Sequence, residues 1–369
     1  MNAAGAGTRP PVGEPAGAAI LRVRVSRRSL LIASAPLIAV ALALVAGAGF
    51  ILAIGEDPLA VYALMLRETL GTGYGIGQML FKATPLVFCG LAVAVGFRAG
   101  LFNIGAEGQL TVAAFTAALV GAGYAGLPAW MLLPLTLAAA MLAGAAWGAV
   151  PGVLKARFGA HEVINTIMLN FVAFALVSYL GRGVFQPATV RTAEIGAGAT
   201  LARLDAWWPA LRGSPANLSL VLALLAAAAV GVLLFRTRLG FELRALGLNA
   251  AAAQYGGVPV GVTQVKAMAV SGALAGLAGM NFVLGYKHFF ELGFSAGVGF
   301  MGIAVALLGR NHPAGVIAAA LFFGALSHGG LAISQRVPRD LVDVLQAIVI
   351  LLAICVQQVV ERAARRMAA

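Results

Sequence analysis

Long apolar stretches constrain this sequence more than any other feature. Four of them, at 30–54, 128–154, 218–235 and 341–356, each approach or exceed the length of a membrane span. A helix needs roughly 20 mostly apolar residues to cross the hydrocarbon core. Helices and closed barrels are the structures that satisfy every backbone polar group in lipid, and the ten-residue alternation of a barrel strand is absent here. The sequence therefore predicts an all-α fold, a polytopic membrane helical bundle.

Composition and charge agree with this class. Hydrophobic residues make up 61% of the 369 residues, charged residues only 10%, and the mean hydropathy is +0.95. A soluble domain needs far more charge than this. The net charge of +12 is explained by basic residues beside the spans on one side of the membrane. Because no basic stripe with interleaved aromatic residues is present, nucleic-acid binding is excluded.

Hydropathy and charge together predict about ten spans with both termini in the cytoplasm. The spans are expected at 30–54, 79–97, 101–121, 128–152, 162–181, 217–235, 263–284, 297–309, 313–333 and 341–359. Most of the 25 Lys and Arg residues then fall on inner segments, as the positive-inside rule requires. The basic residues before residue 30 resemble the start of a signal peptide, but the apolar run that follows them is too long for one. We read it as a first, uncleaved span of a bacterial inner-membrane protein.

The predicted organisation has one large domain. Residues 1–29 are expected to be a disordered cytoplasmic N-terminus, 30–359 a transmembrane domain, and 360–369 a cytoplasmic tail. An amphipathic segment at 56–69 and a polar loop at 183–216 fall outside the membrane, and the longest inner loop is 236–262.

Two glycine-rich turns suggest an internal repeat. Gly96–Gly105 and Gly309–Pro313 each join two short apolar segments, and each carries an arginine, Arg98 or Arg310. Paired, interrupted spans in corresponding halves are typical of transporter repeats. We therefore expect two pseudo-repeated halves; the alternative is coincidence in a chain rich in Gly and Ala.

One polar cluster lies in an otherwise apolar stretch at 100–110. Asn103 and Glu107 are four residues apart and are expected to share a helix face, with Gln109 nearby. A carboxylate inside a bilayer is costly and is a functional-site hypothesis by default, so these residues are candidates for a translocation pathway. The alternative is that Glu107 sits at the inner surface as a helix cap or as a partner of Arg98.

A second polar cluster begins the predicted fifth span. Asn165, Thr166 and Asn170 are further pathway candidates. Glu162 opens the same helix, where a carboxylate favours the positive end of the helix dipole. For Glu162 that structural role is at least as well supported as a pathway role.

The sequence contains none of the constellations expected of an enzyme. It has no G-x-x-x-x-G-K-[ST] loop, so it holds no such nucleotide-hydrolysing loop of its own. Two G-x-G-x-x-G matches, at 121–126 and 297–302, do not follow strands and fail the dinucleotide test. No catalytic residues, metal ligands or cofactor are predicted, and Cys89 and Cys355 are read as packing residues. Glycines at four-residue spacing (Gly96/Gly100, Gly144/Gly148/Gly152, Gly272/Gly276) are expected to bring helices close together.

The inner loop carries signals for two short helices. The first, around Glu242, is expected to stop near Gly247, and Asn249 is expected to cap a second at 250–255 that ends at Gly256. Two short helices in the longest inner loop suit docking onto a partner protein. The alternative is a simple connector.

These segments resemble permeases of the ribose/branched-chain amino acid transporter family, in particular its nucleoside and simple-sugar branch. The resemblance rests on FRAGLFNIGAEGQL (97–110), HEVINTIMLN (161–170), RLGFELRALGLNAAAAQYGG (238–257), SGALAGLAGM (271–280) and GFMGIAVALLGR (299–310), in matching order over about 50–335. It implies a type II ABC importer-like fold. It also implies a second permease, giving a heterodimer, a cytoplasmic ABC ATPase, and a periplasmic or lipoprotein solute-binding protein.

The resemblance also assigns roles to residues. By position, the contacts to the ATPase would come from Glu242, Arg244, Ala245, Gly247, Asn249, Ala251 and Gly256. Asn103, Glu107 and Gln109 match the polar break near the pathway. His161 and Met301 depart from the pattern, where smaller or polar residues are expected.

The expected function is therefore the permease subunit of an ATP-driven importer of a nucleoside, a related purine or a simple sugar. An ion-coupled secondary transporter is the alternative, but it needs intramembrane ionisable pairs, for which Glu107 and Glu162 are few. A membrane-embedded enzyme, the third class, lacks any catalytic constellation.

Overall fold

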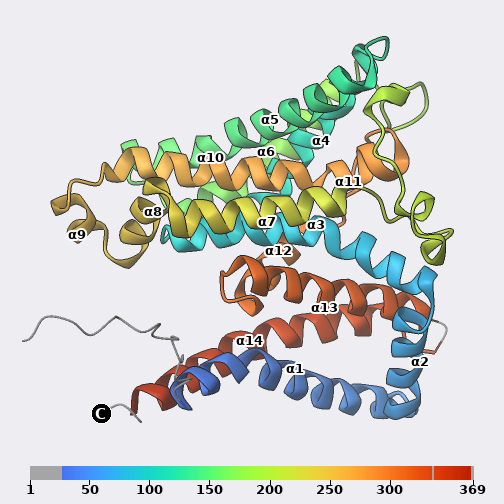
Figure 1. Ribbon diagram of the computed structural model, residues 1–369, viewed down its shortest axis with the longest axis vertical. Helices are drawn as coiled ribbons and strands as arrows, with labels where there is room; N and C mark the ends of the chain where they lie inside the picture. The colour runs from blue at the N-terminus through green and yellow to red at the C-terminus, as the bar shows by residue number, and fades with distance from the viewer. Residues whose placement is uncertain (1–26, 335, 367–369) are drawn as a thin grey trace, which may run out of the picture.

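Residues 27–334 and 336–366 are described in a computed structural model, and they form a bundle of helices that run roughly along one direction (Figure 1). The prediction for 1–29 falls almost wholly outside the described residues. The longer helices are α1 (Arg27–Ala53), α2 (Pro58–Leu70), α3 (Gly73–Arg98), α4 (Ala106–Gly123), α5 (Ala129–Phe158), α6 (Glu162–Gly181), α7 (Ser219–Arg236), α8 (Arg238–Leu248), α9 (Ala250–Tyr255), α10 (Val260–Ala278), α12 (Val298–Leu308), α13 (Pro313–Ala332) and α14 (Arg339–Arg366).

Seven segments of the described chain are long and apolar enough to cross a membrane. They are Ser34–Ala53, Gly73–Arg98, Ala129–Phe158, Glu162–Gly181, Ser219–Arg236, Val260–Lys287 and Pro313–Ala332. The all-helical membrane bundle is thereby confirmed, with seven of the ten predicted spans. The remaining three were predicted where the chain forms α4, α12 and α14.

The two ends of the bundle differ. The helices α8 and α9, the start of α1 and the end of α14 lie together at one end, which we call the α8–α9 end (Figure 1). Helix α2 and the 183–216 loop lie at the opposite end. Helix α14 runs to Arg366, so the predicted tail is helical as far as that residue.

Helix α2 forms where the amphipathic segment at 56–69 was predicted. Asp57 is its N-cap, with Oδ1 accepting from the backbone N–H of Leu59 at 2.9 Å, and Pro58 opens the first turn. The Tyr62 hydroxyl donates to the carbonyl of Leu44 on α1 at 2.7 Å. That bond helps to hold α2 in its place across the end of α1, which can be followed in Figure 1.

Two helices, α4 and α12, begin after a segment of the chain that is not α-helical. Helix α3 ends at Arg98, the segment 99–105 is not α-helical, and α4 starts at Ala106. After α10 the chain passes through α11 (Met280–Phe282) and a π-helical turn (Val283–Lys287) before α12. With 11 residues, α12 is about 16 Å long. Because a bilayer core is about 30 Å thick, this helix is too short to be the full eighth span that was predicted.

Helices α5 and α10 pack closely through Gly144, Gly148 and Gly152 on one side and Gly272 and Gly276 on the other. This confirms the prediction that these two sets of glycines bring helices together. A Cβ placed on Gly144 would lie 2.3 Å from the carbonyl oxygen of Gly272, and one on Gly272 would lie 2.1 Å from that of Gly144. The two backbones touch, which is how small residues stabilise helix pairs in lipid. Gly96 and Gly100 do not form such a row, since α3 ends between them.

Replacing Gly272 with Ala is expected to destabilise the protein. Because the new methyl group would meet backbone atoms of α5, the helices must separate, at a cost of about 1–3 kcal/mol for overpacking. We expect a lower melting temperature for the detergent-purified variant. Gly49→Ala is the control, as this helical glycine has no atom within 4 Å of an added Cβ. Equal melting temperatures for the two variants would contradict the close contact.

Candidate functional site

Glu107 joins the beginnings of two helices. It is the second residue of α4 and is only 3% exposed. Its Oε1 accepts a hydrogen bond from the Ser295 hydroxyl at 2.5 Å and from the Gly297 N–H at 3.2 Å. Its Oε2 accepts from the Gly299 N–H at 2.6 Å. The carboxylate thus ties α4 to the segment that leads into α12.

The surroundings of Glu107 suit a negative charge. The N-termini of α4 and α12 both carry partial positive charge, which stabilises an anion between them. The approach is close, since a Cβ on Gly299 would lie 2.4 Å from the Glu107 nitrogen. The alternative pairing with Arg98 is wrong, because the Arg98 Nε donates instead to the Asn311 carbonyl at 3.0 Å.

Asn103 is the centre of a second buried network. Its Nδ2 donates to the Gln109 Oε1 at 2.9 Å and to the Ser271 hydroxyl oxygen at 2.8 Å. Its Oδ1 accepts from the Gly105 N–H at 2.9 Å. The expectation that Asn103 and Glu107 share a helix face is therefore wrong. Asn103 precedes α4, and its side chain binds the backbone in the way that competes with helix formation.

Helix α6 supplies partners to the backbone of the same break. Thr166 Oγ1 accepts from the Ile104 N–H at 3.3 Å. Asn170 Oδ1 accepts from the Gly108 N–H at 2.8 Å, and its Nδ2 donates to the Ile104 carbonyl at 3.0 Å. Irregular backbone at membrane depth needs such partners. Four of the predicted pathway residues, Asn103, Gln109, Thr166 and Asn170, hence support the broken helix.

Two other polar side chains near the start of α6, those of Asn165 and Glu162, lie apart from this network. The Asn165 side-chain nitrogen is buried and has no hydrogen-bond partner among the described residues. Glu162 pairs with Lys155 of α5 at 2.6 Å. This ion pair, at the start of α6, supports the structural role for Glu162.

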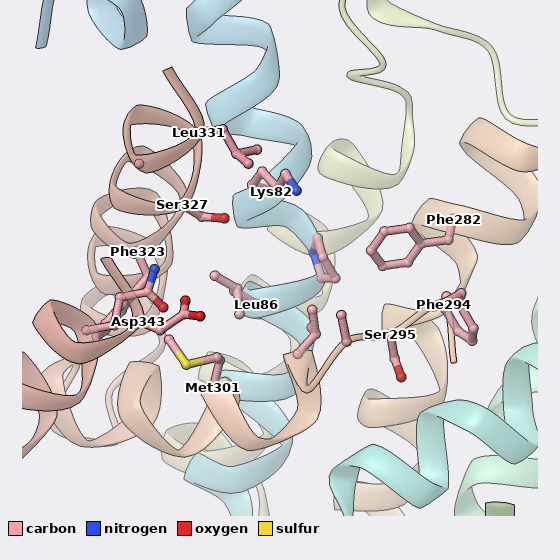
Figure 2. A pocket seen from close by; sticks show the side chains of 15 residues that line it. Lys82, Leu86, Phe282, Phe294, Ser295, Met301, Phe323, Ser327, Leu331 and Asp343 are labelled. Atoms are coloured by element: carbon pink, nitrogen blue, oxygen red, sulfur yellow. The ribbon is translucent and has the colours of Figure 1, made fainter. Parts of the chain in front are cut away.

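Two cavities lie on either side of the segment 294–296. One, of about 580 Å³, is lined by Glu107, by Phe174 and Ser178 of α6, and by Phe300 of α12, among others. The other, of about 190 Å³, lies between α3, α12, α13 and α14 (Figure 2). Ser295 and Ala296 line both. The segment that Glu107 holds in place is therefore a wall between the two cavities.

Sequence reasoning missed two charged residues of the smaller cavity. Lys82 on α3 and Asp343 on α14 both line it. Each falls inside a predicted span, where an ionisable side chain is a functional signal. That signal was available, but the sequence analysis did not single out either residue.

At the α8–α9 end, α8 rests on the turn between α3 and α4. A Cβ on Gly247 would lie 2.3 Å from the Arg98 carbonyl oxygen. Glu242, 8% exposed, accepts from the Arg238 Nε at 2.9 Å. Arg244 lies over the Phe235 ring, with its Cζ 5.6 Å from the centroid. The Arg238–Glu242 pair lies within α8, whereas the contacts of Gly247 and Arg244 fix α8 on the bundle.

Helix α9 has the predicted bounds of 250–255. Asn249 Oδ1 accepts from the Ala252 N–H at 3.0 Å and caps it, and Gly256 follows its last residue. Ala251 and Gly256 are exposed, and Ala245 is partly buried. Two exposed apolar residues that the sequence prediction did not single out, Leu248 and Tyr255, are 88% and 95% exposed. The α8–α9 surface therefore presents apolar side chains outward.

A protein-family comparison decides the class of this molecule. Residues 75–354 match the family of the branched-chain amino acid transport system permease component. The chain belongs to this family. That assignment confirms the prediction that the chain is the permease component of a transporter. A component of this kind does not itself catalyse a reaction.

Several permeases are similar along most of their length. The chain is 42% identical to the guanosine ABC transporter permease protein NupP of Bacillus subtilis, over 86% of this chain and 91% of that protein. It is 38% identical to the glucose ABC transporter permease protein TsgB13 of Haloferax volcanii, over 86% of each. It is 35% identical to the nucleoside permease protein NupB of Lactococcus lactis, over 85% and 88%. No solved structure matches the chain.

Replacing Glu107 with Gln is expected to weaken the junction of α4 and α12. An amide offers one acceptor oxygen where the carboxylate has two, so at least one donor of the α12 segment would face an NH₂ group. Losing one charge-assisted bond costs about 1.5–3 kcal/mol. We expect a lower melting temperature and less uptake.

Glu194→Gln is the matched control for this prediction, because Glu194 is an exposed carboxylate of the 183–216 loop. If both variants melt and transport like the wild type, the carboxylate is not needed for the junction.

Proposed function

We propose that this chain is the membrane-spanning subunit of an ATP-driven importer of nucleosides. The observation that carries the proposal is the 42% identity to a guanosine permease over nearly the whole of that protein. The similarity to a nucleoside permease of Lactococcus lactis supports the same substrate class. A related purine or a simple sugar is the second candidate substrate, favoured by the 38% identity to a glucose permease.

The proposed complex contains a second permease, a cytoplasmic ABC ATPase and a solute-binding protein. The chain resembles both NupP and NupQ, two guanosine permease proteins of Bacillus subtilis, at 42% and 27% identity, which supports a heterodimer. The absence of a phosphate-binding loop from the sequence supports a separate ATPase. The exposed Leu248 and Tyr255 of the α8–α9 surface suit an apolar contact with that subunit.

The proposed mechanism is alternating access. Nucleotide binding and hydrolysis on the ATPase would move α8, which rests on the α3–α4 turn through Gly247. The turn leads directly into Glu107, and Glu107 holds the wall between the two cavities. A substrate shifts the equilibrium between the outward-open and inward-open states only by its differential affinity for them. The energy for uphill transport must therefore come from the nucleotide.

The proposed topology puts both termini and the α8–α9 end in the cytoplasm of a bacterial inner membrane. The charge asymmetry of the sequence supports it. Ten membrane segments, with α4, α12 and α14 added to the seven apolar spans, would give two repeated halves. The pairing of the two Arg-bearing turns, through Arg98 and the Asn311 carbonyl, supports related positions for them.

Reconstitution tests the proposed function. We would place the complex of this chain with its second permease and ATPase in vesicles, supply the binding protein outside and measure guanosine uptake. ATP inside the vesicles should drive accumulation, and a non-hydrolysable analogue should not. Uptake by this chain alone, driven by an ion gradient without ATP, would instead establish the secondary-transporter class.

Replacing Gly247 with Ala is expected to uncouple ATP hydrolysis from uptake. Since the added methyl group would collide with the Arg98 carbonyl, α8 must lift from the α3–α4 turn. We expect uptake to fall severalfold while the complex still assembles and hydrolyses ATP.

Gly261→Ala is the control for this coupling test. It lies at the same end of the bundle, and its nearest neighbour would be 3.5 Å from an added Cβ. Unchanged uptake in Gly247→Ala would count against the route through the turn.

A further inference from the structure

The smaller cavity is built from five helices of a single chain, α3, α11, α12, α13 and α14, and from the segment 294–296. Lys82 comes from α3, Met301 from α12, Ser327 from α13 and Asp343 from α14. Its volume is about 190 Å³, below the roughly 300–1,000 Å³ of drug-sized ligand sites. A cavity of this size suits one small solute.

The lining of the cavity mixes aromatic and polar side chains, with Phe323 beside Asp343 and Ser295 beside Phe294 (Figure 2). Phe282 and Phe294 lie at one end in Figure 2, and Ser327 and Asp343 lie at the other. The two rings meet edge to face, with centroids 5.3 Å apart and an interplanar angle of 69°. Such a cavity is complementary to a solute with a flat ring at one end and hydroxyl groups at the other.

The charged residues that line the cavity also limit which kinds of solute it can hold. Lys82 and Asp343 carry opposite charges and line the same cavity. Ionisable residues in membrane helices are costly and mark solute pathways. With one charge of each sign, the lining favours an uncharged polar solute over a phosphorylated one. Ser295 contributes no free donor, because its hydroxyl is bonded to Glu107.

We infer that this cavity is a subsite for an uncharged purine nucleoside within one permease subunit. The base would lie against Phe282 and Phe294, as bases stack on aromatic side chains elsewhere. Asp343 would accept from the ribose hydroxyls, as carboxylates do in nucleotide-binding folds. Lys82 would donate to the acceptors of the purine edge. The inference rests on the proposed function and adds the place where the substrate is held.

Protection of an engineered cysteine tests occupancy directly. In a Cys355→Ser background, which leaves Cys89 buried, Ser327→Cys would be labelled with a maleimide in the assembled complex. Guanosine should slow labelling at least fivefold, whereas ribose or guanosine monophosphate should not. Labelling that is unaffected by guanosine, or slowed equally by the monophosphate, would overturn the inference.

Uptake kinetics give a second, independent test. Asp343→Asn and Lys82→Met should each raise the KM for ATP-driven guanosine uptake about tenfold, which corresponds to about 1.4 kcal/mol. Glu194→Gln, on the exposed 183–216 loop, should leave KM unchanged. A wild-type complex that transports guanosine while both cavity variants keep its KM would overturn this subsite alone. A wild-type complex that takes up no nucleoside would overturn the proposed function itself.

Discussion

The structure depends on one buried carboxylate. Glu107 accepts three hydrogen bonds from residues 188–192 positions later in the chain, and it does so where two helices begin. Without an anion at this point, the positive ends of two helix dipoles would face each other, and the Gly297 and Gly299 N–H groups would lose their acceptor. The charge is costly to bury, but three donors and two helix dipoles offset that cost. The junction allows both helices to start inside the bundle instead of at its surface.

The backbone polar groups in the non-helical segment before α4 are also hydrogen-bonded by buried side chains. The side chains of Asn103, Thr166 and Asn170 pair with backbone groups between Ile104 and Gly108. Ser271 of α10 accepts from Asn103 and donates to the Ala92 carbonyl on α3 at 2.6 Å. Four helices thus hold the break rigidly. The 294–296 wall, in contrast, has no regular helix of its own and is held through Glu107 and by ring contacts of Phe294.

Hydropathy was sufficient to place the seven long apolar helices, because lipid requires each span to satisfy its own backbone. The predicted bounds of α6, and those of α9 between Asn249 and Gly256, agree with the structure. The start of α4 was not predictable from spacing alone, since Asn103 binds Gly105 and Ser271 instead of continuing the helix. The partners of Glu107 come from a distant segment, and a local pattern carries no signal for them. For Lys82 and Asp343 the signal was present, in charges within apolar runs, but only the packing of α13 against α3 and α14 brings them to one cavity.

The aromatic ring of Phe235 shows how motion at one end of the bundle can reach its middle. Arg98 and Arg244 lie over this ring, with Cζ atoms 5.7 and 5.6 Å from its centroid, and His312 stacks on it at 5.5 Å. These residues belong to the end of α3, to α8 and to the start of α13. A displacement of α8 therefore acts on both Arg-bearing turns together, and Arg98 links them again through the Asn311 carbonyl. One of these turns leads into the start of α4 and the other follows the end of α12, and the beginnings of these two helices meet at Glu107. In the proposed mechanism, the same carboxylate that stabilises the fold would pass a displacement of α8 on to the wall between the cavities.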